Sequence, residues 1–93
     1  MEYVFVTWTQ NDPSMPREVY SEIDASRREV RKVEVFADGR YGFASSSLSR
    51  GSTQLGLEPL PPVEEIAREK EFNLRRGTAV EFEEMWKRAG GGR

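Results

Sequence analysis

Cysteine and histidine are both absent from this 93-residue chain. Without cysteine there is no disulfide and no thiolate ligand, and because secreted domains of this size often depend on disulfides, we expect a cytoplasmic protein. Without histidine the chain lacks the usual general base near neutral pH and the commonest neutral metal ligand. We therefore predict no catalytic residue, no metal site and no cofactor.

Long apolar runs and an excess of positive charge are also missing. No run approaches the roughly 20 residues that a membrane-spanning helix needs, and the first residues lack the basic segment of a signal peptide. The net charge of −2 argues against a nucleic-acid binder, which normally carries a basic excess. Two tryptophans, three tyrosines and five phenylalanines can fill one core. We predict a single domain over residues 1–89 and a flexible glycine-rich tail over 90–93.

The first part of the chain has the patterns of strands. The predicted strands cover residues 1–9, 18–23, 28–36 and 41–44, with a short fifth over 53–55. The first is apolar on both faces, which is typical of a central strand. The third breaks its alternation, which indicates a bulge near Arg31 and Lys32. Asp38-Gly39 predicts a hairpin turn with positive φ at both residues, and the Ser/Gly-rich segment 45–52 predicts a mobile loop.

Two helices are predicted after the strands, and Leu60-Pro61-Pro62 is expected to end the sheet. The first helix covers residues 62–70. The second begins with Thr78 and Glu81 in the spacing of a capping box, and four residues form its apolar stripe: Phe82, Met85, Trp86 and Ala89. Strands first and helices last predict an α+β fold, an antiparallel sheet of four to five strands followed by two C-terminal helices packed on one face.

Five residues are candidates for contacts with a partner: Trp8, Tyr20, Glu22, Asp24 and Arg31. Trp8 ends the first predicted strand beside a proline-containing loop, where an indole is often half exposed. Glu22 and Asp24 stand two apart, a spacing that can serve acid–base chemistry or hold a divalent ion. Arg31 belongs to a basic cluster with Arg27, Arg28 and Lys32. Because acidic residues flank that cluster, cross-strand ion pairs explain the same pattern.

Several sequence words resemble a family of short bacterial domains of unknown function. They are YSEID at 20–24, REVRKVEVF at 28–36, DGR at 38–40, TQLG at 53–56 and PLPP at 59–62, followed by Phe82-Glu83 and Trp86. The resemblance covers nearly the whole chain. It implies a small single-domain protein of the kind encoded near polymorphic toxins, and by analogy an immunity-type role. Relatives often carry a histidine after the first-strand tryptophan, where this chain has Thr9-Gln10-Asn11.

Three functional hypotheses follow. The first is a non-catalytic protein-binding domain, an immunity-type inhibitor of a toxin domain, whose acidic character suits a basic nuclease. The second is a small ligand-binding or enzymatic domain that uses Glu22, Asp24 and Arg31. The third is a nucleic-acid binder that uses the basic residues from Arg27 to Lys32 with Tyr41 and Phe43 as a stacking surface, and the charge balance argues against it. The sequence leaves the partner's identity and the oligomeric state open.

Overall fold

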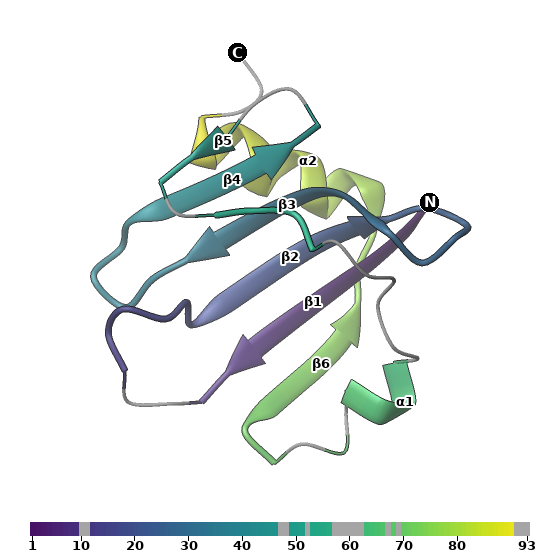
Figure 1. The fold of residues 1–93 in the computed structure, drawn as a ribbon, viewed down its shortest axis with the longest axis horizontal. Helices are drawn as coiled ribbons and strands as arrows, with labels where there is room; N and C mark the ends of the chain where they lie inside the picture. The colour runs from purple at the N-terminus through teal and green to yellow at the C-terminus, as the bar shows by residue number, and fades with distance from the viewer. Residues whose placement is uncertain are drawn as a thin grey trace.

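The computed structural model describes residues 1–9, 12–46, 49–51, 53–56, 63–66, 68 and 70–90. These residues form an antiparallel sheet in the order β5-β4-β3-β2-β1-β6 (Figure 1). The strands are β1 (Glu2–Trp8), β2 (Glu18–Ile23), β3 (Glu29–Val35), β4 (Tyr41–Ser45), the two-residue β5 (Ser49–Arg50) and β6 (Phe72–Arg76). The predicted α+β class with an antiparallel sheet is confirmed.

β1 is an interior strand, as its two apolar faces predict. It pairs with β2 on one side and with β6 on the other. Val4 and Phe5, which point to opposite faces, are 2% and 4% exposed. Apolar material therefore covers both sides of the sheet at this strand.

The hairpin between β3 and β4 is confirmed, but its predicted turn type is wrong. Gly39 has a φ of 88°, whereas Asp38 does not have a positive φ. The Gly39 N–H donates to the Phe36 carbonyl, and the Phe36 N–H donates to the Arg40 carbonyl, both at 3.0 Å. The connection is thus a three-residue loop in which only the glycine adopts the left-handed conformation.

The irregularity of β3 lies close to its predicted place. Glu22 pairs with Arg31 and Ile23 pairs with Glu29, so Val30 is the extra residue of a bulge in the β2–β3 ladder. Beyond the bulge, Arg31 points to the same face of the sheet as Glu22, which matters for the site described below.

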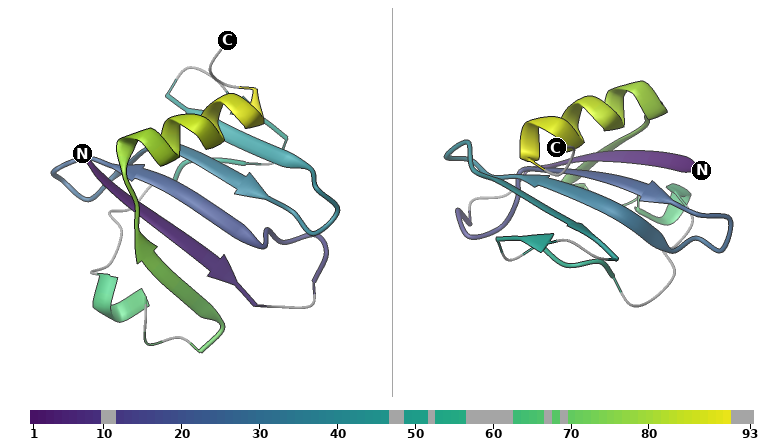
Figure 2. Two further views of the ribbon diagram at one scale, coloured as in Figure 1. Left: turned by 180° about the vertical axis from the view of Figure 1, so that it is seen from behind. Right: turned by 90° about the horizontal axis from the view of Figure 1, so that it is seen from above.

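Helix α2 (Ala79–Ala89) covers part of one face of the sheet (Figure 2). The predicted capping box is present: Thr78 accepts from the Glu81 N–H, and the Glu81 carboxylate accepts from the Thr78 N–H. Gly90, with a φ of 101°, ends the helix, and residues 91–93 of the predicted tail lie outside the described residues. The core consists of Phe5, Val33, Phe43, Phe82, Trp86 and Ala89, with Met85 packed against it, so the predicted apolar stripe is confirmed.

The prediction of two helices packed on one face is wrong. α1 (Val63–Ile66) has four residues and lies beside β6, away from the face that α2 covers (Figures 1 and 2). Between the two helices the chain forms β6, which the sequence analysis missed. In the sequence of β6, FNLRR, only the first four residues alternate between apolar and polar, and this edge strand depends on its pairing with the distant β1.

The short fifth strand is also misplaced. β5 lies inside the segment that was predicted to be a mobile loop, whereas residues 53–56 are not a strand. Residues 60–62, where the sheet was predicted to end, lie outside the described residues.

Residues 53–56 instead follow β3 on the face opposite α2. The buried Thr53 hydroxyl donates to Glu34 at 2.7 Å, Lys32 Nζ donates to the Gln54 carbonyl at 3.1 Å, and the Gly56 N–H donates to Glu29 at 2.7 Å. The TQLG word thus has a structural role, because it fastens the connection between β5 and α1 to the sheet. No helix among the described residues is both long and apolar enough to span a membrane.

Candidate functional site

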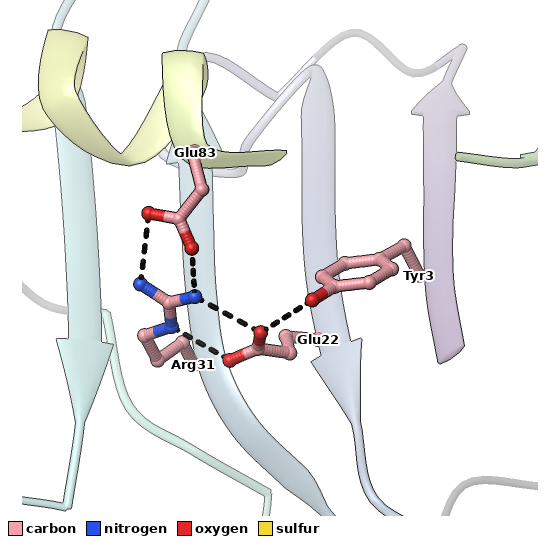
Figure 3. Close-up of polar contacts among 4 residues, drawn as sticks. All are labelled: Tyr3, Glu22, Arg31 and Glu83. Atoms are coloured by element: carbon pink, nitrogen blue, oxygen red, sulfur yellow. Dashed lines mark hydrogen bonds and ion pairs between the residues drawn. The ribbon is translucent and has the colours of Figure 1, made fainter. Parts of the chain in front are cut away.

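Four polar side chains meet beneath α2, as Figure 3 shows. Strand register brings three of them together, because Glu22 stands opposite Tyr3 on β1 and opposite Arg31 on β3. Arg31 Nε and Nη2 donate to the two oxygens of Glu22 at 2.6 and 2.9 Å, and the Tyr3 hydroxyl donates to the same carboxylate at 2.8 Å. Arg31 also donates to Glu83 of α2. We call these four residues the ion cluster.

Two members of the ion cluster, Glu22 and Arg31, are largely withdrawn from water, whereas the Glu83 side chain is 47% exposed. The Glu22 side chain is 7% exposed and the Arg31 side chain is 21% exposed. The Arg31 guanidinium carbon lies 4.9 Å from the ring centroid of Phe82 and 5.0 Å from that of Trp86. These rings shield the cation and add a cation–π attraction, so the pair of charges is held by packing as well as by hydrogen bonds.

The proton states of the ion cluster follow from these contacts. The hydrogen bonds from Arg31 hold the pKa of Glu22 below its usual range, against the opposing effect of burial. Burial and the hydrogen bond to Glu22 raise the pKa of the Tyr3 hydroxyl. Near neutral pH Glu22 is therefore charged and Tyr3 is protonated, so neither is suited to exchange a proton there.

The structure brings only two of the five predicted site residues into contact with each other. Glu22 and Arg31 form the cross-strand ion pair that flanking charges had indicated. The Asp24 carboxylate accepts from the backbone N–H groups of Ser26 and Arg28 at 2.9 and 3.1 Å, so it stabilises the β2–β3 turn. Among the described residues there is no group of three or more acidic side chains that could hold a metal ion.

Tyr20 lies in a different place, on the part of the sheet face that α2 leaves uncovered. With Phe5, Thr7, Asn73 and Arg75 it lines a hollow of about 280 Å³, which we call the open-face hollow. The rings of Tyr20 and Phe5 meet edge to face with centroids 4.8 Å apart, and burial raises the pKa of Tyr20. The Arg75 guanidinium carbon lies 4.9 Å from the centroid of Phe5, and its side chain is 60% exposed. An aromatic floor and an accessible cation thus occur together.

Trp8 stands on the opposite face from Tyr20. It is half-buried at the end of β1, and its ring lies 5.5 Å from that of Phe72. Residues of β1 alternate between faces, and Thr7, not Trp8, lines the open-face hollow. Trp8 and Tyr20 therefore cannot belong to one contact patch on the sheet. The predicted binding roles of all five residues stay predictions.

The sequence analysis missed Tyr3 and Glu83 of the ion cluster and Arg75 of the hollow. Glu83 stood in one of the family words, next to Phe82, but no pattern in the sequence connects it to Arg31. Tyr3 and Arg75 join their sites through the register of β1 with β2 and of β1 with β6, which only the folded sheet reveals.

A family comparison matches residues 2–91 to a domain family described as a domain of unknown function (DUF6881). The chain belongs to this family. The resemblance to an uncharacterised domain family is thus confirmed, and the DUF6881 match spans both the ion cluster and the open-face hollow. The comparisons with curated proteins and with solved structures found no significant match.

Proposed function

We propose that this domain acts by binding another protein and not by catalysis. The observation that carries the proposal is the open-face hollow, where Tyr20, Phe5 and Arg75 lie together. α2 covers only part of this face of the sheet (Figure 2). Tyrosine and arginine are among the residues that most often dominate the binding energy of protein interfaces. The best candidates for chemistry, Glu22 and Arg31, are instead bonded to each other.

The first biological role to test is an immunity-type inhibitor of a bacterial toxin domain, acting in the cytoplasm. This part of the proposal is supported by the resemblance to small proteins encoded near polymorphic toxins. A stoichiometric inhibitor needs a stable scaffold and an accessible contact surface, and it needs no chemistry of its own.

The rival proposal, a ligand-binding or enzymatic domain, would use Glu22, Asp24 and Arg31. Each of these side chains already has partners within the domain, and a substrate would have to replace them. The rival proposal makes a clear prediction: an activity of the domain should be abolished by Glu22→Gln or Asp24→Asn in a protein that remains folded. Such a result would overturn the non-catalytic proposal.

Protein binding is tested by affinity capture from the native host with a matched pair of variants, Arg75→Glu and Arg76→Glu. The two arginines are neighbours in β6 with side chains 60% and 63% exposed, and each pairs with one glutamate, Glu81 or Glu2. They point to opposite faces of the sheet, and only Arg75 lines the open-face hollow. We expect the wild type and Arg76→Glu to recover one dominant protein that Arg75→Glu loses.

Equal recovery by the two variants would contradict the assignment of the contact face. Recovery of nucleic acid or of a small molecule in place of a protein would overturn the proposed function itself. The immunity-type role has its own test, in which the captured protein is expressed alone and together with the domain. We expect toxicity that the wild type relieves and Arg75→Glu does not, and a harmless captured protein would refute the inhibitor role alone.

A further inference from the structure

A second hollow, which the proposed function does not use, lies beside the C-terminal end of α2. It measures about 480 Å³ and is lined by Phe36, Arg40, Tyr41, Gly42, Gly51, Arg88 and Ala89. The β3–β4 turn, β4, the residue after β5 and the last turn of α2 each contribute to it. We call it the arginine hollow.

Two glycines line the arginine hollow, Gly42 of β4 and Gly51 after β5. Gly51 has a φ of 72°, and a Cβ atom there would lie 3.9 Å from the Cα of Gly42, so the two glycines are neighbours at ordinary van der Waals distance. Phe36, Tyr41 and Ala89 supply apolar walls around this point. Such walls reduce the contact of a bound charge with water, which strengthens its attraction to a neighbouring cation.

The described side chains that line the arginine hollow carry charge of one sign only. Two arginines line it, and none of the described residues that line it is acidic. Within the described part of the chain, Arg88 has no ion pair. Arg40 pairs with Asp38 of its own turn at 2.6 Å, but the two side chains are 65% and 57% exposed, and exposed pairs of this kind contribute little and exchange readily. The chain as a whole has a net charge of −2, so this is a local reversal of sign.

We propose that the arginine hollow binds an acidic side chain, aspartate or glutamate, presented by a protein partner. The inference rests on the proposed protein-binding function and names the chemistry of one contact. A guanidinium binds a carboxylate through two parallel hydrogen bonds, and the Arg40 guanidinium lies 5.0 Å from the ring centroid of Phe36, which also lines the hollow.

The arginine hollow and the open-face hollow can serve the same partner. Glu18 pairs with Val35, and Val35 pairs with Tyr41, so these three side chains point to the same face of the sheet. Tyr20 lies two residues along β2 from Glu18 and points to that face too, which is the face that α2 partly covers. Both pack against the same core cluster. A partner laid over this face would meet Arg75 at one end and the arginine hollow at the other.

The test is a titration of the ¹⁵N-labelled domain with a short blocked oligoglutamate peptide, followed by NMR at the Arg88 Nε–H and the Gly51 N–H. We expect saturable shifts at both groups, and an affinity weakened about tenfold or more by Arg88→Gln, because a charge-assisted pair is lost. Lys87→Gln is the matched control. It removes the same charge from the adjacent exposed residue of α2, which does not line the hollow, and should change the affinity by about twofold or less.

Three results would overturn the inference: no saturable shift at the hollow, equal weakening by the two variants, or tighter binding of a short oligodeoxythymidylate at the same groups. The last would assign the hollow to phosphate. The titration needs no natural partner, so its failure leaves the capture experiment with Arg75→Glu and Arg76→Glu intact. An empty capture with a positive titration would refute the proposed function while the carboxylate site stands.

Discussion

Removing the arginine of the ion cluster is the sharpest test of how this fold is held together. Arg31→Met keeps an unbranched apolar stem against Phe82 and Trp86, but it leaves the Glu22 carboxylate, 7% exposed, with the Tyr3 hydroxyl as its remaining partner in the cluster. Removing one partner of a buried ion pair costs about 3–5 kcal/mol. Because Arg31 is 21% exposed and the Glu83 carboxylate can be hydrated once Arg31 is gone, we expect the free energy of unfolding to fall by about 3 kcal/mol.

Urea unfolding, followed by tryptophan fluorescence, measures this loss, and the melting temperature should fall by about 12 °C or more. The control is the double variant Arg31→Met/Glu22→Leu. It should recover most of the lost stability, because no buried carboxylate remains unpaired. A loss below about 1 kcal/mol for Arg31→Met, or a double variant less stable than the single one, would refute the interpretation of the cluster as a buried ion pair.

The stabilities of the wild type and of Arg31→Met should depend on pH in opposite directions. In the wild type the pKa of Glu22 lies below its ordinary value of 4.5. The ionised Glu22 therefore contributes fully to the free energy of unfolding above pH 4.5, and this contribution is lost as the pH falls through the lower pKa of the folded protein. In Arg31→Met, burial without a cation should raise the pKa of Glu22. Protonation then removes the cost of the buried charge, and the stability difference between the two proteins should narrow on acidification from pH 7. A constant difference would contradict this reasoning.

Three further substitutions test the packing and the turn. Trp86→Ala removes a side chain that is 5% exposed and should lower the free energy of unfolding by about 3–5 kcal/mol in urea titrations, whereas a loss below about 1 kcal/mol would show that the indole is not core. Gly77→Ala would place a Cβ atom against the ring of Phe5, closer than van der Waals contact allows, and should lower the free energy of unfolding by about 1–3 kcal/mol and change the ring signal of Phe5 by NMR. A neutral result would mean that the ring can move away freely. Gly39→Val, at a φ of 88°, should cost about 1–2 kcal/mol in thermal unfolding and Gly39→Asn clearly less, so equal losses would contradict the left-handed turn.

The sequence predicted the elements whose signals are local. β1 to β4 and α2 follow from apolar periodicity, and the ends of α2 follow from the capping box and the glycine after Ala89. β6 was missed because its local signal is weak: the alternation covers only four residues, and two of the five residues of the strand are arginines. The strand forms through pairing with β1, about seventy residues away in the chain. α1 was overestimated because proline followed by an apolar spacing indicates where a helix can begin, not how far it extends.

The candidate sites show the same division. The Glu22–Arg31 pair could be predicted as a cross-strand ion pair because the two residues lie on strands joined by a short turn. Its burial could not be predicted, since it depends on where α2 crosses the sheet and places Glu83. The open-face hollow was found only in part, through Tyr20, because Arg75 reaches it from the strand that the sequence did not reveal.

The central claim, that a protein binds over the open-face hollow, is tested most directly by cross-linking from a single position. The chain contains no cysteine, so Asn73→Cys and Arg76→Cys can each carry one benzophenone label, on opposite faces of β6. Each labelled domain is added to a lysate of the native host and irradiated. The domain labelled at residue 73, which lines the hollow, should cross-link to one dominant protein, and the domain labelled at residue 76 should not. Cross-linking from residue 76 alone, or to nucleic acid from residue 73, would contradict the account.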